Sequence, residues 1–580
     1  MSSSSSVPAA GPALREGGRI LVDQLKIHGT SRLYGVPGES FLPVLDALCD
    51  VPMPFITCRH EGAAAVMAEA EGKLTGRPGV AFVTRGPGAC NASSGVHIAH
   101  QDSTPMILFI GQVGSSAFDR EAFQEVEFRT MFAPLCKWVA QIDRADRIPE
   151  YVSRAFYTAT SGRPGPVVLA LPEDVLSARL AVADARPYVK VEPHATADDV
   201  NHTLRLLAGA RQPLLIVGGG GWTQQASHDL QRFVETHHLP VVASFRCQDY
   251  LDNDHPLYVG DLGLSPNPNL AARIRDADFI LLCGARLGEA SSRGYTLLDV
   301  PTPRQTLVHV YPDPNELGRV YQPDLAINAS APAFFAAAAA AVVAPAAARA
   351  VPVAETKGSE RHPVWSAFAE EARAAYLEWQ RPKPGPGTVQ LADIVTALRQ
   401  ELPAETIVTN GAGNYTVWVH RYHRYTRFRT QLGPTSGSMG YGLPAAIAAS
   451  LLEPERPVIA FAGDGCFMMH APELATAVQY GAKPIVVVVN NGTLGTIRTH
   501  QERRYPGRVS ATDLFNPDFA ALARACGAHG ETVTRTEEFS PALERCRQAN
   551  KAALIELRLD PEALTPSATL SQIRQSAQRG

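Results

Sequence analysis

The stretch “PVIAFAGDGCFMMHAPELATAVQYGAKPIVVVVNN”, residues 457–491, contains two apolar runs separated by a helical pattern. “PVIAFAG” is a short apolar run that ends in glycine, and “PIVVVV” has the unbroken apolar character of a strand buried on both faces. “HAPELATAVQYG” places apolar residues at helical spacing and ends at Gly481, a typical helix stop. The stretch therefore predicts a strand–helix–strand unit of parallel α/β construction.

Polar residues stand where both predicted strands end. In open α/β sheets ligands bind at the carboxyl ends of the strands, and Gly463 and Gly465 let backbone N–H groups approach a diphosphate. Mg²⁺ prefers oxygen ligands, so we expect it to bind Asp464, the side-chain oxygen of Asn491 and the backbone carbonyl of Thr493. The structural alternative is that Gly-Asp-Gly forms a tight turn and that the asparagines only end a strand.

The same alternation of strands and helices recurs along the chain. At 580 residues the chain exceeds the roughly 250–300 residues at which single cores stop growing, so several domains are expected. We predict an α/β fold of three doubly wound domains with parallel sheets. An Ala/Pro-rich stretch between the second and third has few core-forming residues and predicts a linker. The expected segments are a disordered leader (1–14), an N-terminal domain (15–190), a central domain (191–350), a linker (351–385), a C-terminal domain (386–565) and a C-terminal tail (566–580).

Composition argues against several classes of partner. The chain has 53 basic and 57 acidic residues and no basic block, which argues against nucleic acid. Its longest apolar stretch, residues 334–344, is well short of the ~20 residues that a membrane helix needs, so no membrane partner is expected. The nine cysteines are scattered without a CxxC pair, and the N-terminus lacks the pattern of a signal peptide. We therefore expect a cytoplasmic protein.

The spacing of Gly-Asp-Gly and Asn-Asn matches the thiamine diphosphate signature, in which NN follows GDG after about 27 residues. The chain resembles the superfamily of acetolactate synthase, pyruvate decarboxylase and benzoylformate decarboxylase, and most of all acetolactate synthase large subunits. Five further segments resemble blocks of that family in the same order: “GVPGES” (35–40), “CRHEGAAAVMAEAEGKLTGRPGVAFVTRGPGACN” (58–91), “DSTPMILFIGQV” (102–113), “AFQE” (122–125) and “TSGSMGYGLPAAIAAS” (435–450).

The resemblance implies that thiamine diphosphate and Mg²⁺ are cofactors. The N-terminal domain would bind the pyrimidine, and Glu61 in “RHEGA” would exchange a proton with its N1′ atom. Alternatively, Glu61 only complements a helix dipole. Met439 would hold the cofactor in its bent form, or merely fill a gap in the core. The expected cofactor-binding residues are Gly437, Met439, Gly463, Asp464, Gly465, Asn491 and Asn414.

Glu61 and Asp464 lie about 400 residues apart, in different domains, yet both must reach one cofactor. In the family the cofactor sits between the first domain of one subunit and the third domain of another. The resemblance therefore implies a homodimer or a homotetramer.

Substrate choice depends on the residues around the reacting carbon. Glu39 stands where synthases usually have glycine, and pyruvate decarboxylases have an acidic residue in a similar phrase; it would donate a proton there. Gln124 matches a synthase glutamine that approaches the reacting group. His500 stands in the place of a synthase tryptophan, although a solvated surface histidine fits the sequence equally well. The further candidate substrate residues are Phe118, Phe123, Lys137 and His100.

The central domain departs from the synthase pattern. Synthases bind a structural flavin there through an “RFDDR” phrase, whereas this chain reads “ARLGEASSRGY” at 285–295. The “GGGGW” turn at 218–222 suits a phosphate but also an ordinary strand-to-helix turn. The sequence therefore argues against FAD.

The expected function is decarboxylation of a 2-oxo acid of the pyruvate type, followed by carboligation to a second carbonyl compound. Both partners would be small molecules. One alternative is a simple 2-oxo acid decarboxylase, which Glu39 favours, and another is a relative of 2-hydroxyacyl-CoA lyase or oxalyl-CoA decarboxylase. A non-catalytic thiamine diphosphate-binding subunit is the alternative of a different class. The presence of Glu61 and the metal ligands argues against it.

Overall fold

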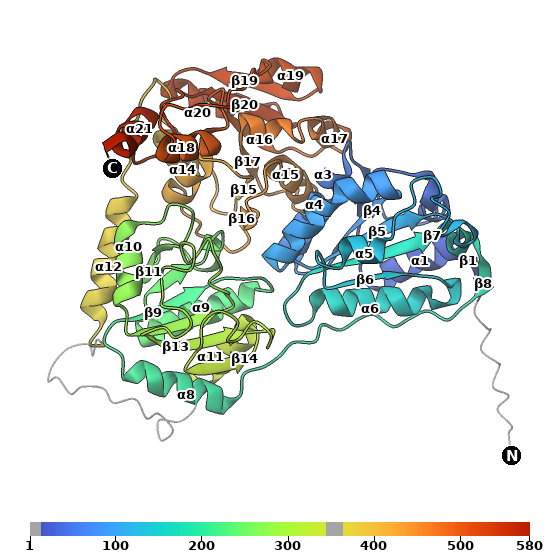
Figure 1. The fold of residues 1–580 in the computed structure, drawn as a ribbon, viewed down its shortest axis with the longest axis horizontal. Coiled ribbons are helices and arrows are strands. Elements are labelled where there is room, and N and C mark those ends of the chain that lie inside the picture. Colours follow the sequence, from blue (N-terminus) through green and yellow to red (C-terminus); the bar gives the residue numbers. More distant parts are fainter. Residues whose placement is uncertain (1–12, 344–362, 580) are drawn as a thin grey trace.

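A computed structural model describes residues 13–343 and 363–579, and it contains three six-stranded parallel sheets with helices packed against them (Figure 1). The predicted fold class is confirmed. When the six strands of each sheet are numbered along the chain, their order across the sheet is 2-1-3-4-6-5 in both the N-terminal and the C-terminal domain. The central sheet instead follows 3-2-1-4-5-6, the order of dinucleotide-binding sheets.

The N-terminal sheet has the order β3-β2-β4-β5-β7-β6. A short antiparallel pair, β1 with β8, accompanies it. The strands of this domain are β1 (Leu14–Glu16), β2 (Leu33–Gly35), β3 (Phe55–Thr57), β4 (Gly79–Val83), β5 (Met106–Gln112), β6 (Trp138–Gln141), β7 (Pro166–Pro172) and β8 (Arg179–Ala181). Its helices are α1 (Gly17–Ile27), α2 (Leu42–Leu48), α3 (Glu61–Thr75), α4 (Gly86–Asp102), α5 (Phe128–Phe132), α6 (Ile148–Thr160) and α7 (Glu173–Ser177).

The central sheet has the order β11-β10-β9-β12-β13-β14. Its strands are β9 (Pro213–Val217), β10 (Val241–Ala243), β11 (Tyr258–Asp261), β12 (Phe279–Cys283), β13 (Thr306–Tyr311) and β14 (Leu325–Asn328). Its helices are α8 (Ala197–Ala208), α9 (Gln224–His237), α10 (Pro268–Asp276) and α11 (Ala331–Val343).

The C-terminal sheet has the order β16-β15-β17-β18-β20-β19. Its strands are β15 (Ile407–Asn410), β16 (Gln431–Leu432), β17 (Val458–Gly463), β18 (Ile485–Asn490), β19 (His529–Val533) and β20 (Ala553–Arg558). Its helices are α13 (Leu391–Glu401), α14 (Tyr415–Tyr422), α15 (Gly442–Leu452), α16 (Asp464–Met468), α17 (Glu473–Gln479), α18 (Gly495–Arg504), α19 (Phe519–Ala525), α20 (Phe539–Gln548) and α21 (Leu570–Arg579).

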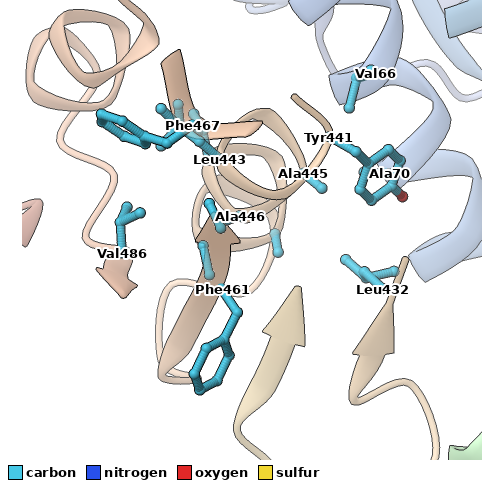
Figure 2. Packing of buried hydrophobic residues seen from close by; sticks show 14 of the residues in the cluster. Val66, Ala70, Leu432, Tyr441, Leu443, Ala445, Ala446, Phe461, Phe467 and Val486 are labelled. Carbon is cyan, nitrogen blue, oxygen red and sulfur yellow. The ribbon is translucent and has the colours of Figure 1, made fainter. Parts of the chain in front are cut away.

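One hydrophobic core joins the N-terminal and C-terminal domains. Helices α3 and α15 are rich in alanine, and their small side chains let the two domains approach closely. Figure 2 shows Tyr441, just before α15, facing Val66 and Ala70 of α3. The Tyr441 hydroxyl donates a hydrogen bond to Glu69 at 2.7 Å within this interface. The two outer domains therefore hold α3 in a fixed position.

The chain differs from the predicted segments at two places. Residues 366–379 of the expected linker form α12 (Ser366–Trp379), whose buried Phe368, Ala372 and Tyr376 pack as one face against the central domain. The alanine- and proline-rich sequence before this helix led to the prediction of a linker. The expected tail contains α21, which packs against α18. Residues 1–12 of the expected leader, and 351–362 of the linker, lie outside the described residues.

Among the described helices, none combines the length and the apolar composition needed to cross a membrane.

Candidate active site

Asp464 lies where two neighbouring strands end. Strands β17 and β18 run parallel, and Asp464 and Asn491 each directly follow one of them. The Asp464 carboxylate accepts hydrogen bonds from the Gly465 N–H at 2.8 Å and the Gly492 N–H at 2.9 Å. Gly492 has a φ of +65°, a conformation that favours glycine. The segments after β17 and β18 therefore meet at the Asp464 carboxylate.

The residues beside Asp464 fit a hard cation. Asp464 is buried, and burial raises the pKa of its carboxyl group while its hydrogen-bond donors oppose that rise. Asn491 is half-buried, and its Oδ1 accepts a long hydrogen bond, 3.2 Å from the Thr493 N–H. Within the described residues, no cluster of three or more His, Cys, Asp or Glu side chains could hold a metal. One carboxylate, one amide oxygen and a backbone carbonyl match the few protein ligands that Mg²⁺ takes.

The glycines of the C-terminal domain show which of the predicted cofactor-binding residues approach one another. Gly437 has a φ of +68°, and a Cβ atom there would meet no atom within 4 Å. A Cβ atom on Gly465 would lie 3.7 Å from Cε of Met439, so the loop before α15 reaches the Gly-Asp-Gly turn. A Cβ atom on Gly495 would lie 3.4 Å from Nδ2 of Asn491 and 3.7 Å from Nδ2 of Asn414. Met439 thus approaches the turn after β17, and Asn414 and Asn491 approach the start of α18.

Glu61 is the first residue of α3 and is half-buried. Its Oε2 accepts a hydrogen bond from Asn91 Nδ2 at 2.9 Å. Among the described residues, Glu61 makes no hydrogen bond or ion pair with the residues around Asp464.

Charged side chains meet at the carboxyl edge of the N-terminal sheet. Arg85, after β4, donates a hydrogen bond to Glu39 at 3.0 Å and also pairs with Glu173, after β7. The Glu39 side chain is 67% exposed. The short 3₁₀ helix that begins at Glu39 has Gly38 as its N-cap, without a side-chain cap. The structure thus places Glu39 at a sheet edge typical of ligand binding.

The loop after β5 carries three predicted substrate residues. Its Gln124 has a φ of +65°, and its carbonyl accepts the Gly86 N–H at the start of α4, at 3.0 Å. Phe123 is 73% exposed and Phe118 is half-buried. This loop therefore stands at the same sheet edge as Glu39.

Three other candidates lie elsewhere. Lys137 stands at the amino end of β6, where its ammonium group donates hydrogen bonds to the carbonyls of Thr158 and Ser161 and burial lowers its pKa to about 8. His100 is in the last turn of α4, and burial lowers its pKa to about 4. His500 is exposed on α18. The structure does not bring Lys137 and His100 to the edge that carries Glu39.

His100 lines a cavity of about 750 Å³ between the domains. The cavity lies beside the turns after β9 and β12, where the strand order of the central sheet reverses. Gly219, after β9, has a φ of +76°, and a Cβ atom there would lie 1.8 Å from the Gly284 carbonyl oxygen. Arg163, Arg286 and Arg319 also line the cavity. Its position and its arginines suit a phosphate-bearing ligand.

Sequence reasoning missed two residues that organise these sites. Asn516 donates hydrogen bonds to Asp464 and to Asn490, but it lies in an irregular segment without a motif. Glu473 is fully buried and binds the backbone just before Glu61. Its position in the first turn of a helix resembles an ordinary dipole-complementing acid, so no sequence pattern indicates this contact.

Three family models match the chain in order. They describe the N-terminal thiamine pyrophosphate-binding domain (15–131), the central domain (200–338) and the C-terminal thiamine pyrophosphate-binding domain (411–557) of thiamine pyrophosphate enzymes. The chain belongs to the thiamine pyrophosphate enzyme family. Its cofactor is accordingly thiamine diphosphate, and the predicted family is confirmed.

Similarity to curated relatives extends over nearly the full length. The chain is 32% identical to the acetolactate synthase large subunit of Parasynechococcus marenigrum, over 95% of this chain and 88% of the relative. It is 30% identical to the acetolactate synthase isozyme 2 large subunit of Escherichia coli, over 94% and 95%. It is also 30% identical to the acetolactate synthase large subunit of Corynebacterium glutamicum, over 94% and 87%. This thiamine pyrophosphate enzyme is therefore acetolactate synthase-like.

Proposed function

We propose that this protein decarboxylates a 2-oxo acid of the pyruvate type and joins the remaining acyl fragment to a second carbonyl compound. The observation that carries this proposal is its similarity to acetolactate synthase large subunits over 94–95% of the chain. When bound, thiamine diphosphate supplies a carbon nucleophile and takes up the electron pair that decarboxylation releases. The protein must bind this cofactor, control its protons and orient the substrates.

The proposed Mg²⁺ ligands are the Asp464 carboxylate, the Asn491 side-chain oxygen and the Thr493 carbonyl oxygen. Their position after β17 and β18 supports this role, as does the match of the ligand types to Mg²⁺. The cation would offset the charge of a diphosphate beside Asp464. The approach of Met439 to Gly465, next to Asp464, supports a cofactor site there, and Gly437 leaves open space in the loop that carries Met439.

The proposed role of Glu61 is to exchange a proton with N1′ of the cofactor pyrimidine. Its hydrogen bond from Asn91 fixes one carboxylate oxygen, which leaves the other for the ring nitrogen. We place the cofactor between two copies of the chain, in a cytoplasmic homodimer or homotetramer, as the resemblance to acetolactate synthases implies. Gln124, Phe118 and Phe123 would then line the substrate entrance.

Two observations favour other candidate functions. Glu39, which is exposed at the carboxyl edge of the N-terminal sheet, favours a simple 2-oxo acid decarboxylase, because a carboxyl group near the reacting carbon could protonate the fragment after loss of CO₂. The arginine-lined interdomain cavity favours a 2-hydroxyacyl-CoA lyase or an oxalyl-CoA decarboxylase, whose substrates carry phosphates. A non-catalytic subunit is disfavoured because both Glu61 and Asp464 are present.

The test titrates the apoprotein with thiamine diphosphate and Mg²⁺ and then supplies a panel of 2-oxo acids and acyl-CoA esters. We expect CO₂ from pyruvate-like acids and a carboligation product containing both carbonyl substrates. Glu61→Gln serves as the control, since an amide can hydrogen-bond N1′ but cannot exchange its proton. CO₂ accompanied only by free aldehyde would favour the simple decarboxylase, and no turnover of any substrate would favour the non-catalytic subunit.

A further inference from the structure

The loop between β3 and α3, which leads into Glu61, is held by the C-terminal domain of the same chain. The backbone N–H groups of Arg59 and His60 both donate hydrogen bonds to Oε1 of Glu473, at 2.9 and 3.0 Å. The other oxygen of Glu473 accepts a hydrogen bond from the Thr476 hydroxyl at 2.6 Å. The Glu473 side chain is fully buried at the first residue of α17. One carboxylate thus binds the two residues that immediately precede Glu61.

Tyr480, just after α17, makes a second contact, with strand β3 directly before this loop. Its hydroxyl accepts a hydrogen bond from the Thr57 N–H at 2.8 Å and donates one to the Phe55 carbonyl at 3.1 Å. We call Glu473 and Tyr480 the α17 clamp. Together they bind backbone groups from the start of β3 to the residue before α3.

Within the part of the chain that the structure describes, the clamp supplies hydrogen-bond partners that the N-terminal domain does not provide. Helix α3 begins at Glu61, so the N–H groups of Arg59 and His60 precede the helix, and Glu473 is the acceptor for both. The His60 side chain caps the helix by accepting the Gly62 N–H at 3.0 Å. Loss of the carboxylate would remove the acceptor of both N–H groups at a domain interface, and the loop would shift to reach water.

His470 makes further contacts in the same interface. The rings of His60 and His470 lie 5.3 Å apart between centroids, and Nδ1 of His470 is 2.9 Å from the Gly440 carbonyl oxygen. Gly440 directly follows Met439 in the proposed cofactor loop. The segment that begins at Asp464 therefore contacts the loop ahead of Glu61 through more than one side chain.

We propose that Glu473, assisted by Tyr480, is a positioning residue that holds Glu61 where it can exchange a proton with the cofactor. This inference rests on the proposed function of Glu61. Glu473 contacts backbone N–H groups and not the proposed metal ligands, so its effect should be on proton exchange and not on the affinity for the diphosphate. A general acid or base loses its contribution of about 10²–10⁴-fold when it is displaced from hydrogen-bond distance.

The test compares Glu473→Ala with Glu473→Gln. An amide keeps the oxygen that accepts both N–H groups, so Glu473→Gln should behave like the wild type. Gln479→Ala is the matched control, because Gln479 accepts a hydrogen bond from the Arg59 side chain across the same interface without touching the loop backbone. Glu61→Gln reports the loss of the acid itself.

Three quantities are measured: amide hydrogen exchange of residues 55–62 in the apoprotein, the dissociation constant of thiamine diphosphate with Mg²⁺, and exchange of the cofactor C2 proton for deuterium. We expect Glu473→Ala to speed amide exchange of the loop and to slow C2 exchange by at least about tenfold. The dissociation constant should change less than about threefold. Glu473→Gln and Gln479→Ala should match the wild type in all three.

The outcomes separate the inference from the function on which it rests. If Glu61→Gln leaves C2 exchange unchanged, the proposed role of Glu61 fails. If Glu61→Gln slows it but Glu473→Ala slows it no more than Gln479→Ala, only the positioning role fails. Failure of Glu473→Gln to restore exchange also overturns that role. Should Glu473→Ala not fold, Tyr480→Phe decides: it removes the hydroxyl but keeps the ring, and unchanged loop and C2 exchange would reject the clamp.

Discussion

The Asn516 side-chain amide donates a hydrogen bond to Oδ2 of Asp464 at 2.8 Å and another to Oδ1 of Asn490 at 2.9 Å. Asn516 thereby ties an irregular segment to the ends of both β17 and β18. The same Asp464 oxygen also accepts the Gly492 N–H. These donors favour the charged form of a buried carboxylate, which is the form that a cation requires.

Replacing Asp464 with Ala should abolish Mg²⁺-dependent binding of thiamine diphosphate. The change removes the only charged ligand of the proposed metal site and leaves the diphosphate poorly compensated. Titration calorimetry with and without Mg²⁺ should show a loss of affinity of at least about 100-fold. Asp513→Ala is the control, since that nearby carboxylate is 88% exposed. The prediction is falsified if Asp464→Ala retains wild-type affinity in Mg²⁺.

The sequence predicted those parts of the site that consist of special residues at fixed local spacing. Asp464 and Asn491 each follow a strand whose apolar run is unmistakable, so their common position at a sheet edge follows from the residue pattern alone. Asn516 could not be found in this way, because it lies 52 residues from Asp464 in the sequence and reaches it through an irregular segment. Tertiary contacts of this kind leave no periodic pattern.

Other differences have similar causes. The sequence predicts a linker where α12 forms, because alanine and proline dominate the neighbouring sequence, although the apolar face of the helix has ordinary helical spacing. Lys137 and His100 lie near the substrate segments in sequence, yet Lys137 stands at the amino end of β6 and His100 in the last turn of α4, away from the carboxyl edge of the sheet. Proximity in sequence therefore predicted little about side chains at the far ends of these elements.

Replacing Arg574 with Gln should lower the free energy of unfolding at neutral pH. The free energy of unfolding of the variant should then decrease less on acidification than that of the wild type. The Arg574 guanidinium, with help from Gly507 and Arg498, lowers the pKa of Glu502 to about 2. A carboxyl group with a depressed pKa stabilises the fold above its unfolded pKa near 4.5, and this contribution is lost as pH falls toward 2.

The measurement is thermal melting at pH 7, 5, 4 and 3. Arg579→Gln makes the same charge change at an exposed position of the same helix and should melt like the wild type. Equal acid sensitivity of the Arg574 and Arg579 variants would contradict the role assigned to the Glu502 pair.

The purified protein should be colourless if the central domain lacks flavin. The interdomain cavity has room for a nucleotide, but its “ARLGEASSRGY” turn departs from the flavin-binding phrase of synthases. Absorbance of the denatured supernatant tests this, because released flavin absorbs near ~450 nm. A chromophore at one per chain would overturn the prediction.

Replacing Glu39 with Gly should raise the ratio of carboligation product to free aldehyde. A carboxyl group near the reacting carbon can protonate the decarboxylated fragment, a step worth ~10²–10⁴-fold, and it also fills space that a second carbonyl compound needs. Decarboxylation should persist, because Glu61 and the metal site are unchanged. Arg85 would still pair with Glu173, so the substitution leaves no unpaired cation.

Glu39→Gln separates the two effects, since it removes the proton but keeps the volume. If protonation decides the outcome, both variants should raise the ratio; if space decides it, only Glu39→Gly should. The alternative is a purely structural Glu39 that supports the short helix or its ion pair. That role predicts a constant ratio of carboligation product to aldehyde and a lower melting temperature. The decrease should be small, because an exposed ion pair contributes only about 0–1 kcal/mol. Product analysis and melting of both variants decide between these roles, and a constant ratio in both would exclude a catalytic Glu39.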